Sequence, residues 1–198
     1  MIGSSRVAVL TLALGATFAL SAASASATTI TFEADSVGIK LNGFVSADSP
    51  FVSFTDTLNA ELVVFDSGPT GHALAVLFAD PSLLRMDFTQ NVNSLEVAFG
   101  NDFSPGTFAW LLTFAGTTPL GFVSVPVNGD GLVNQTISFS GVEFNVAAFY
   151  FGNSIGTPLN EIELIDNVIF NVVPEPATML LLGTGLTGLV ARRRRASR

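Results

Sequence analysis

The chain has 198 residues, no cysteine, one histidine and a formal net charge of −8. This composition excludes cysteine nucleophiles, disulfides and the usual Cys and His zinc sites. Residues 28–173 contain fifteen acidic residues against two basic ones, Lys40 and Arg85, a formal charge of −13. A nucleic-acid partner is therefore not expected, because neutralising phosphates requires clustered Lys and Arg.

Residues 1–27 predict a secretory signal peptide. Arg6 precedes an apolar run over 7–20, and small residues follow as far as Ala25-Ser26-Ala27. Because this order matches the n-region, h-region and A-x-A cleavage site, we expect a signal peptidase to cut after Ala27. The alternative is a transmembrane anchor, but the run is shorter than the ~20 residues that a spanning helix usually needs.

Residues 28–173 are expected to form one all-β domain. Short alternating segments rich in Val, Ile, Thr and Phe are separated by Gly, Pro, Asn and Asp, which is the pattern of strands and turns. The expected strands are 29–33, 39–46, 51–55, 60–65, 73–79, 84–89, 94–99, 107–115, 120–126, 136–140, 143–151 and 161–171. We predict a two-sheet antiparallel sandwich of the jelly-roll type, with an up-and-down barrel as the alternative.

Alternation identifies the inward face of two of these strands. Leu95, Val97 and Phe99 share one face of 94–99, and Ile137 and Phe139 share one face of 136–140. Since side chains alternate along a strand, these residues are expected in the core.

Two segments rich in Gly, Asp and Asn are interpreted as turns, although their oxygens could also face a cation: 65–68 with 70–71, and 128–131. The Asn-Gly and Asp-Gly pairs of the second segment predict a hairpin.

The tail, residues 174–198, has three parts. It begins with Pro174-Glu175-Pro176, continues with an apolar stretch over 177–191, and then carries four adjacent arginines: Arg192, Arg193, Arg194 and Arg195. We expect 177–191 to be a transmembrane helix whose arginine end lies in the cytoplasm, by the positive-inside rule. Residues 183–188 also fit G-x-G-x-x-G, but no strand precedes them, so no dinucleotide site is expected.

These three parts, in this order, resemble the PEP-CTERM sorting domain that many bacterial surface proteins carry. The resemblance implies that an exosortase, a membrane-embedded cysteine protease, processes the protein near Pro174-Glu175-Pro176. It also implies an exported protein that resides transiently in the inner membrane and then reaches the cell surface or the extracellular matrix.

Asp166 lies in the expected final strand, 161–171. It shares one face of that strand with four apolar residues: Ile162, Leu164, Val168 and Phe170. If that face is buried, the carboxylate needs a partner or a metal ion. The alternative is that Asp166 caps a bulge, or faces water on a strand whose other side, with Ile165 and Ile169, is the buried one.

Acidic residues at both ends of the domain suggest a metal ion. Glu33 and Asp35 near the start, with Asp166 near the end, are loosely similar to jelly-roll carbohydrate-binding modules that tie their first and last strands with a structural calcium. The resemblance implies a calcium site at Glu33, Asp35 and Asp166, and two or three carboxylates with backbone carbonyls would suffice for it.

An enzyme is not expected. His72 is the only histidine and no G-x-S-x-G elbow accompanies it, while some pair of the fifteen carboxylates will be close by chance. Trp110 and Tyr150 lie in strongly apolar strands and are expected in the core rather than in a sugar platform. We therefore expect a non-catalytic structural or adhesive protein, with extracellular polysaccharide as a candidate ligand. The alternatives are a carbohydrate-active enzyme with a carboxylate pair, and an assembling subunit without a glycan ligand.

Overall fold

The computed structural model describes residues 27–58, 61–68, 71–100 and 106–173. Within these ranges the chain forms strands and no α-helix, and every strand pairing is antiparallel. The strands are β1 (Ala27–Ile30), β2 (Gly38–Lys40), β3 (Phe44–Val45), β4 (Val52–Asp56), β5 (Leu62–Asp66), β6 (His72–Val76), β7 (Leu84–Gly100), β8 (Phe108–Ala115), β9 (Thr118–Pro126), β10 (Gln135–Gly152) and β11 (Leu164–Val172). The predicted all-β antiparallel fold is confirmed.

The two ends of the chain lie outside the described residues. This applies to the predicted signal peptide up to Ser26, to the Pro174-Glu175-Pro176 motif, and to the predicted helix 177–191 with its arginines. The described residues all belong to one compact unit, Ser24–Pro174. None of the described segments is a helix of the length and apolarity needed to cross a membrane.

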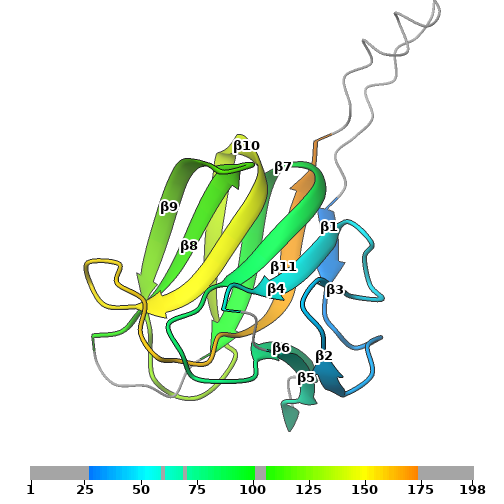
Figure 1. Cartoon of the computed structure of the whole chain (residues 1–198), viewed down its shortest axis with the longest axis vertical. Helices are drawn as coiled ribbons and strands as arrows, with labels where there is room; N and C mark the ends of the chain where they lie inside the picture. The colour runs from blue at the N-terminus through cyan, green and yellow to red at the C-terminus, as the bar shows by residue number, and fades with distance from the viewer. Residues whose placement is uncertain (1–26, 59–60, 69–70, 101–105, 174–198) are drawn as a thin grey trace, which may run out of the picture. The chain divides into compact units, whose positions relative to one another are not determined.

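Two long strands, β7 and β10, connect the layers of the sandwich. Each merges two strands that the sequence predicted separately, 84–89 with 94–99 and 136–140 with 143–151. Their mutual pairing shifts register between Ser140 and Val146, and Gly141 in this stretch has a φ of 100°, which a residue with a side chain rarely adopts. Figure 1 shows both strands bending over at the top of the view, so that each contributes to both layers.

The hydrogen-bonded strand order assigns each strand to a layer. One layer runs β2-β5-β6-β11 and continues into the second half of β7 and the first half of β10, with β1 also beside β11. The other runs β3-β4, then the first half of β7, the second half of β10, β8 and β9. Strands that follow one another in the sequence are often not paired in the sheet; β6, for example, pairs with β11 rather than β7. The alternative of an up-and-down barrel is therefore wrong.

Two local predictions also differ from the structure. The expected strand 39–46 is divided into β2 and β3 by a turn at Asn42–Gly43, where Gly43 has a φ of 82° and the Asn42 side chain bonds the main chain of Asp56. The expected hairpin at 128–131 is wrong, because β9 pairs with β8 while β10 pairs with β7 and β8.

The core between the layers is rich in phenylalanine. Leu95, Val97 and Phe99 are fully buried and Ile137 is 1% exposed, as the alternation predicted. At the bend of the long strands, the Phe88 ring lies 6.0 Å from Phe144 and 5.1 Å from Phe170. Burial of such a ring stabilises the fold by about 1.5–3 kcal/mol, so this core compensates for the lack of disulfides.

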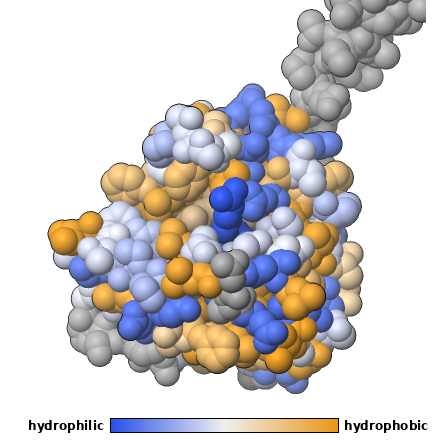
Figure 2. Space-filling view, in the orientation of Figure 1, coloured by the Kyte–Doolittle hydropathy of each residue, from blue (hydrophilic) through white to orange (hydrophobic). Residues whose placement is uncertain are grey.

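The surface carries hydrophobic side chains in several places. The most exposed large ones include Leu41, Phe122 and Ile155, which lie in different parts of the fold. On the face in Figure 2, hydrophobic residues are interspersed with hydrophilic ones.

Phe99→Ala is expected to lower the free energy of unfolding by about 3–5 kcal/mol, because the ring is fully buried against Phe149 and Phe151. Chemical denaturation of the full chain in mild detergent measures this. Phe122→Ala is the matched control, since the Phe122 ring is 65% exposed. Equal losses for the two variants would contradict this description of the core.

Candidate functional site

A bulge in β11 decides which of its side chains face outward. Asn167 has a φ of 44°, and the pairing of β11 with β7 shifts register between Asp166 and Ile169. Ile165 before the bulge and Val168 after it are both fully buried in the core. The face with Ile165 is therefore the buried one before the bulge, and the face with Val168 and Phe170 is the buried one after it. Each of the two predicted alternatives is right for one part of the strand. Leu164 and Asp166 point to the outer side of the sheet.

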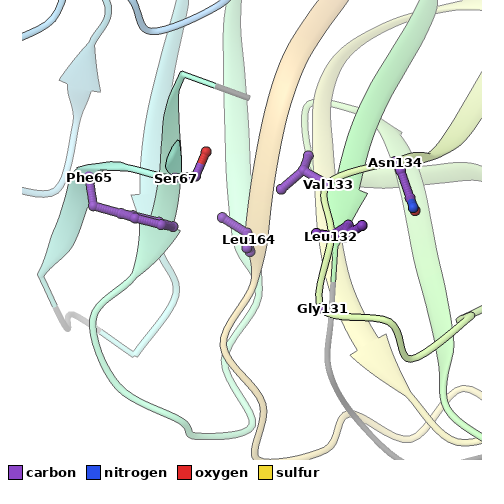
Figure 3. Close-up of a pocket in the computed structure, with 7 residues that line it drawn as sticks. All are labelled: Phe65, Ser67, Gly131, Leu132, Val133, Asn134 and Leu164. Carbon is purple, nitrogen blue, oxygen red and sulfur yellow. The ribbon is translucent and has the colours of Figure 1, made fainter. Parts of the chain in front are cut away.

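Leu164 forms the floor of a groove on this outer side. The groove has a volume of about 430 Å³ and lies between β5 and the segment before β10. Its lining residues are Phe65, Ser67, Gly131, Leu132, Val133, Asn134 and Leu164. Figure 3 shows Phe65 and Ser67 on one side of Leu164, with Leu132 and Val133 on the other.

Small residues beside Leu164 keep the floor low. Its cross-strand partners are Ala75 on β6 and Gly100 on β7, and partners across a ladder share one face of the sheet. A Cβ placed on Gly100 would lie 2.5 Å from the Leu132 carbonyl oxygen. Glycine is therefore required at position 100 for the Leu132 main chain to approach the sheet.

The Asp130 carboxylate fixes the wall of the groove over 128–134. It accepts hydrogen bonds from the Leu132 main-chain N–H at 2.9 Å and the Asn134 side chain at 2.8 Å. The Asn134 bond, the Leu132 bond and a further contact with Asn128 lower the pKa of Asp130. These contacts support the interpretation of 128–131 as a turn.

Asp166 lies two residues from the groove floor, next to a second carboxylate. It is only 2% exposed, and burial, together with the charge of Glu33, raises its pKa to about 6. The N–H of Asn167 donates to Asp166 Oδ1 at 2.6 Å and so favours the charged form. Strongly shifted carboxyl groups are frequent at functional sites.

Glu33 is positioned by the start of β6. Its Oε1 accepts the main-chain N–H of His72 at 2.7 Å. The carboxylate also occupies the space that a side chain on Gly71 would need, and Gly71 has a φ of 85°. The His72 ring itself lies with Nδ1 3.2 Å from the Phe32 carbonyl oxygen, so it joins β6 to the segment after β1.

Asp35, the third residue of the predicted calcium site, has other partners. Its two carboxylate oxygens accept the Ser46 hydroxyl at 2.5 Å and the Ala47 main-chain N–H at 2.9 Å. The structure thus brings Glu33 and Asp166 together, while Asp35 binds the 46–47 segment. Among the described residues, no three His, Cys, Asp or Glu side chains meet in a metal-binding arrangement. Calcium at these residues stays a prediction.

Trp110 and Tyr150 are buried but lie outside the main core. Their rings stack at 13° with 6.2 Å between centroids. Trp110 Nε1 donates to the Asn153 carbonyl at 3.2 Å, and the Tyr150 hydroxyl donates to the Gly156 carbonyl at 2.9 Å. The pair therefore holds the 153–156 segment against the outer side of the second layer, rather than offering a free aromatic platform.

Comparison with protein families identifies the end of the chain. Residues 172–195 match the PEP-CTERM protein-sorting motif. The match includes Pro174-Glu175-Pro176 and the four arginines, so the predicted resemblance is confirmed and the chain carries a protein-sorting signal. No curated protein sequence matches the chain.

Several solved structures resemble the chain at low sequence identity. The carbohydrate-binding module TmCBM61, solved with β-1,4-galactotriose, is 13% identical, with a TM-score of 0.35 over 62% of this chain and 89% of that one. A β-1,3-glucan-binding CBM6 from Bacillus halodurans is 20% identical, with a TM-score of 0.35 over 73% and 95%. The module CBM6cm-2 from Cellvibrio mixtus lichenase 5A, solved with cellotriose, is 15% identical, with a TM-score of 0.27 over 74% and 97%.

Asp166→Asn is expected to raise the melting temperature at about pH 7.5 and to change it little at about pH 4. The pKa of Asp166 is higher in the folded chain than its ordinary value, so the folded state binds the proton more tightly than the unfolded state. Stability is therefore lost as the pH rises between the two values, and the amide avoids that loss. Thermal melts across this pH range measure the difference.

Glu96→Gln, at an exposed position on β7, is the control for removing a carboxylate. If the Asp166→Asn variant melted in parallel with the wild type at every pH, the description of Asp166 as a destabilised buried acid would be contradicted.

Proposed function

We propose that this is an exported, exosortase-processed protein of the cell surface or extracellular matrix, whose β-sandwich binds a neutral polysaccharide in the groove without cleaving it. The observation that carries the binding proposal is the groove itself, with its low floor and apolar walls. A volume of about 430 Å³ lies in the range of small-ligand sites. Phe65 and Leu132 offer apolar faces for sugar rings. The polar groups at the edge, on Ser67 and Asn134, already bond Gly71 and Asp130 within the chain, so the proposal rests on the apolar contacts.

The sorting signal at 172–195 supports the export part of the proposal. In this account residues 1–27 are removed by signal peptidase, residues 28–173 are the binding domain, and 174–198 holds the protein in the inner membrane until an exosortase acts. Such a route delivers the domain to the compartment where extracellular polysaccharide is found.

The charge of the domain favours a neutral glycan over an acidic one. Residues 28–173 have a formal charge of −13, which repels an acidic polymer. Their two cationic side chains are engaged elsewhere: Arg85 pairs with Asp87 at 2.6 Å, and Lys40 Nζ bonds Ser36 at 3.0 Å.

A second candidate function is carbohydrate cleavage by the carboxylates of Asp166 and Glu33. The raised pKa of Asp166 beside a second carboxylate favours it, since glycoside hydrolysis uses such a pair. Binding is preferred because Asp166 is 2% exposed and both its oxygens accept hydrogen bonds from Asn167. A carboxyl group in this position has little access to a glycosidic oxygen.

The full chain in mild detergent is expected to bind a neutral polysaccharide from a panel of neutral and acidic polymers, without releasing new reducing ends. Phe65→Ala is expected to weaken binding about tenfold or more, because it removes one wall of the groove. Affinity electrophoresis and a reducing-end assay measure the two quantities.

Phe122→Ala is the matched control, because it removes the same ring from the outer side of the second layer and is expected to leave binding unchanged. Loss of binding in Phe122→Ala alone would move the ligand to the other layer. Release of reducing ends that disappears in Asp166→Asn would establish the enzyme instead.

A further inference from the structure

A second group of carboxylates lies inside the sandwich, on the opposite side of the sheet from the groove. Three segments meet there: the end of β4 at Asp56, the segment 80–82 before β7, and the segment 161–163 before β11. Asp56 pairs with Leu84, and Asp80 forms a bridge with Glu161. The main-chain carbonyl of Glu163 accepts the N–H of Val76 at 3.2 Å. Glu163 lies two residues before Ile165, whose side chain is buried in the core. Because side chains two positions apart point to the same side, the Glu163 side chain points inward.

Several oxygens in this group are buried without a hydrogen-bond partner. Glu163 is fully buried, and neither of its carboxylate oxygens makes a hydrogen bond of good geometry, although the main-chain N–H groups of Glu163 and Phe151 are close enough to lower its pKa. Asp56 is also fully buried; its Oδ1 accepts the Leu58 N–H at 2.9 Å, but its Oδ2 has no partner. The Ser82 hydroxyl oxygen, in a residue 1% exposed, is likewise unpaired. Unsatisfied buried oxygens of this kind are costly.

The charges in this group repel one another. Burial, together with the charges of Asp56 and Asp80, raises the pKa of Glu163 to about 9. The main-chain N–H groups of Glu163 and Phe151 offset only part of this effect. The cations of the domain, Lys40 and Arg85, pair with Ser36 and Asp87 elsewhere.

We propose that Asp56 and Glu163 together bind one divalent cation, Ca²⁺, which links the end of β4 to the start of β11 inside the sandwich. Two carboxylates balance the charge of one such ion. The donors are hard oxygens, with the Ser82 hydroxyl as a further one, and Ca²⁺ prefers such ligands and accepts carbonyl oxygens and water for the remainder. The proposed site uses two carboxylates. It is therefore compatible with the finding that no three His, Cys, Asp or Glu side chains converge among the described residues.

This site differs from the one predicted at Glu33 and Asp166. Asp166 faces the outer side of the sheet, whereas Glu163 faces the interior. The simplest competing explanation is that Glu163 carries a proton and binds no ion. The two explanations differ in whether calcium stabilises the fold and in which carboxylate that effect requires.

Calcium binding is tested by thermal melts of the full chain in mild detergent, in EDTA and in about 10 mM CaCl₂, which exceeds the dissociation constants of about 10⁻⁴–10⁻³ M typical of extracellular sites. We expect calcium to raise the melting temperature by about 5–10 °C, if the ion is about 100-fold above its dissociation constant. Equilibrium dialysis should give one ion per chain. NaCl at matched ionic strength should not reproduce the shift.

Glu163→Gln is expected to lose the calcium-dependent shift and to weaken calcium binding about tenfold or more. In EDTA this variant should melt at or above the wild-type temperature, because an amide never carries a charge that the fold would have to bury. Asp56→Asn, which keeps the acceptor for the Leu58 N–H, should also lose the shift, and it serves as the test if Glu163→Gln does not fold. Glu96→Gln, at an exposed position, should keep it.

Three results would overturn the proposal. The first is a wild-type chain whose melting temperature does not respond to calcium, which would leave Glu163 as a buried acid that binds no ion. The second is an undiminished calcium shift in both Glu163→Gln and Asp56→Asn. The third is loss of the shift in Asp166→Asn alone, which would place the ion at the outer carboxylates. None of these results bears on polysaccharide binding in the groove.

Discussion

The antiparallel pairing of β7 with β10 is the constraint on which the rest of the sandwich depends. Both strands take part in both layers, so the alignment of the layers follows from how these two strands bend. Phe88 and Phe144 lie on either side of the bend with their rings edge to face, and Phe170 of β11 packs against Phe88. Since the chain contains no cysteine, packed rings at the bend take the place that a covalent link between sheets has in many exported domains.

The bulge in β11 then separates two acidic residues that are only three positions apart. Glu163 precedes it and faces the interior, while Asp166 forms part of it and faces outward beside Glu33. A regular strand could not place Ile165, Val168 and Phe170 in one core, because alternation would send Val168 to the opposite face from Ile165. The same irregularity thus produces a continuous core, an outer groove floored by Leu164, and an inner group of carboxylates.

The regular parts of the fold could be predicted from the sequence. Strand positions followed from alternation, and the inward faces of 94–99 and 136–140 were correct because these two segments pair with each other in an unbroken register. Alternation is a local property, however, and it does not report where a strand bends or bulges. The continuity of β7 and β10 depends on contacts between distant segments, and so it was missed. The bulge at Asp166–Asn167 was one of two alternatives, and alternation could not decide between them.

The candidate sites show the same limit. The sequence pointed to Asp166 and Glu33, which the fold does bring together, but Asp35 is occupied by Ser46 and Ala47. Glu163 was overlooked, although it lies two positions before Ile165. If Ile165 is in the core, alternation places the Glu163 side chain on the same buried side. The groove could not be found from sequence, because it needs Gly100 to let the 131–134 segment approach β11 opposite Phe65.

The central functional claim is that the groove between β5 and the 131–134 segment binds a neutral polysaccharide. Hydrogen–deuterium exchange of the full chain, with and without such a polymer, tests this most directly because it maps the contact along the chain. The account predicts slower exchange at 65–67 and 131–134, with β8 and β9 unchanged. Protection confined to β8 and β9, or no protection with any neutral polymer, would contradict it.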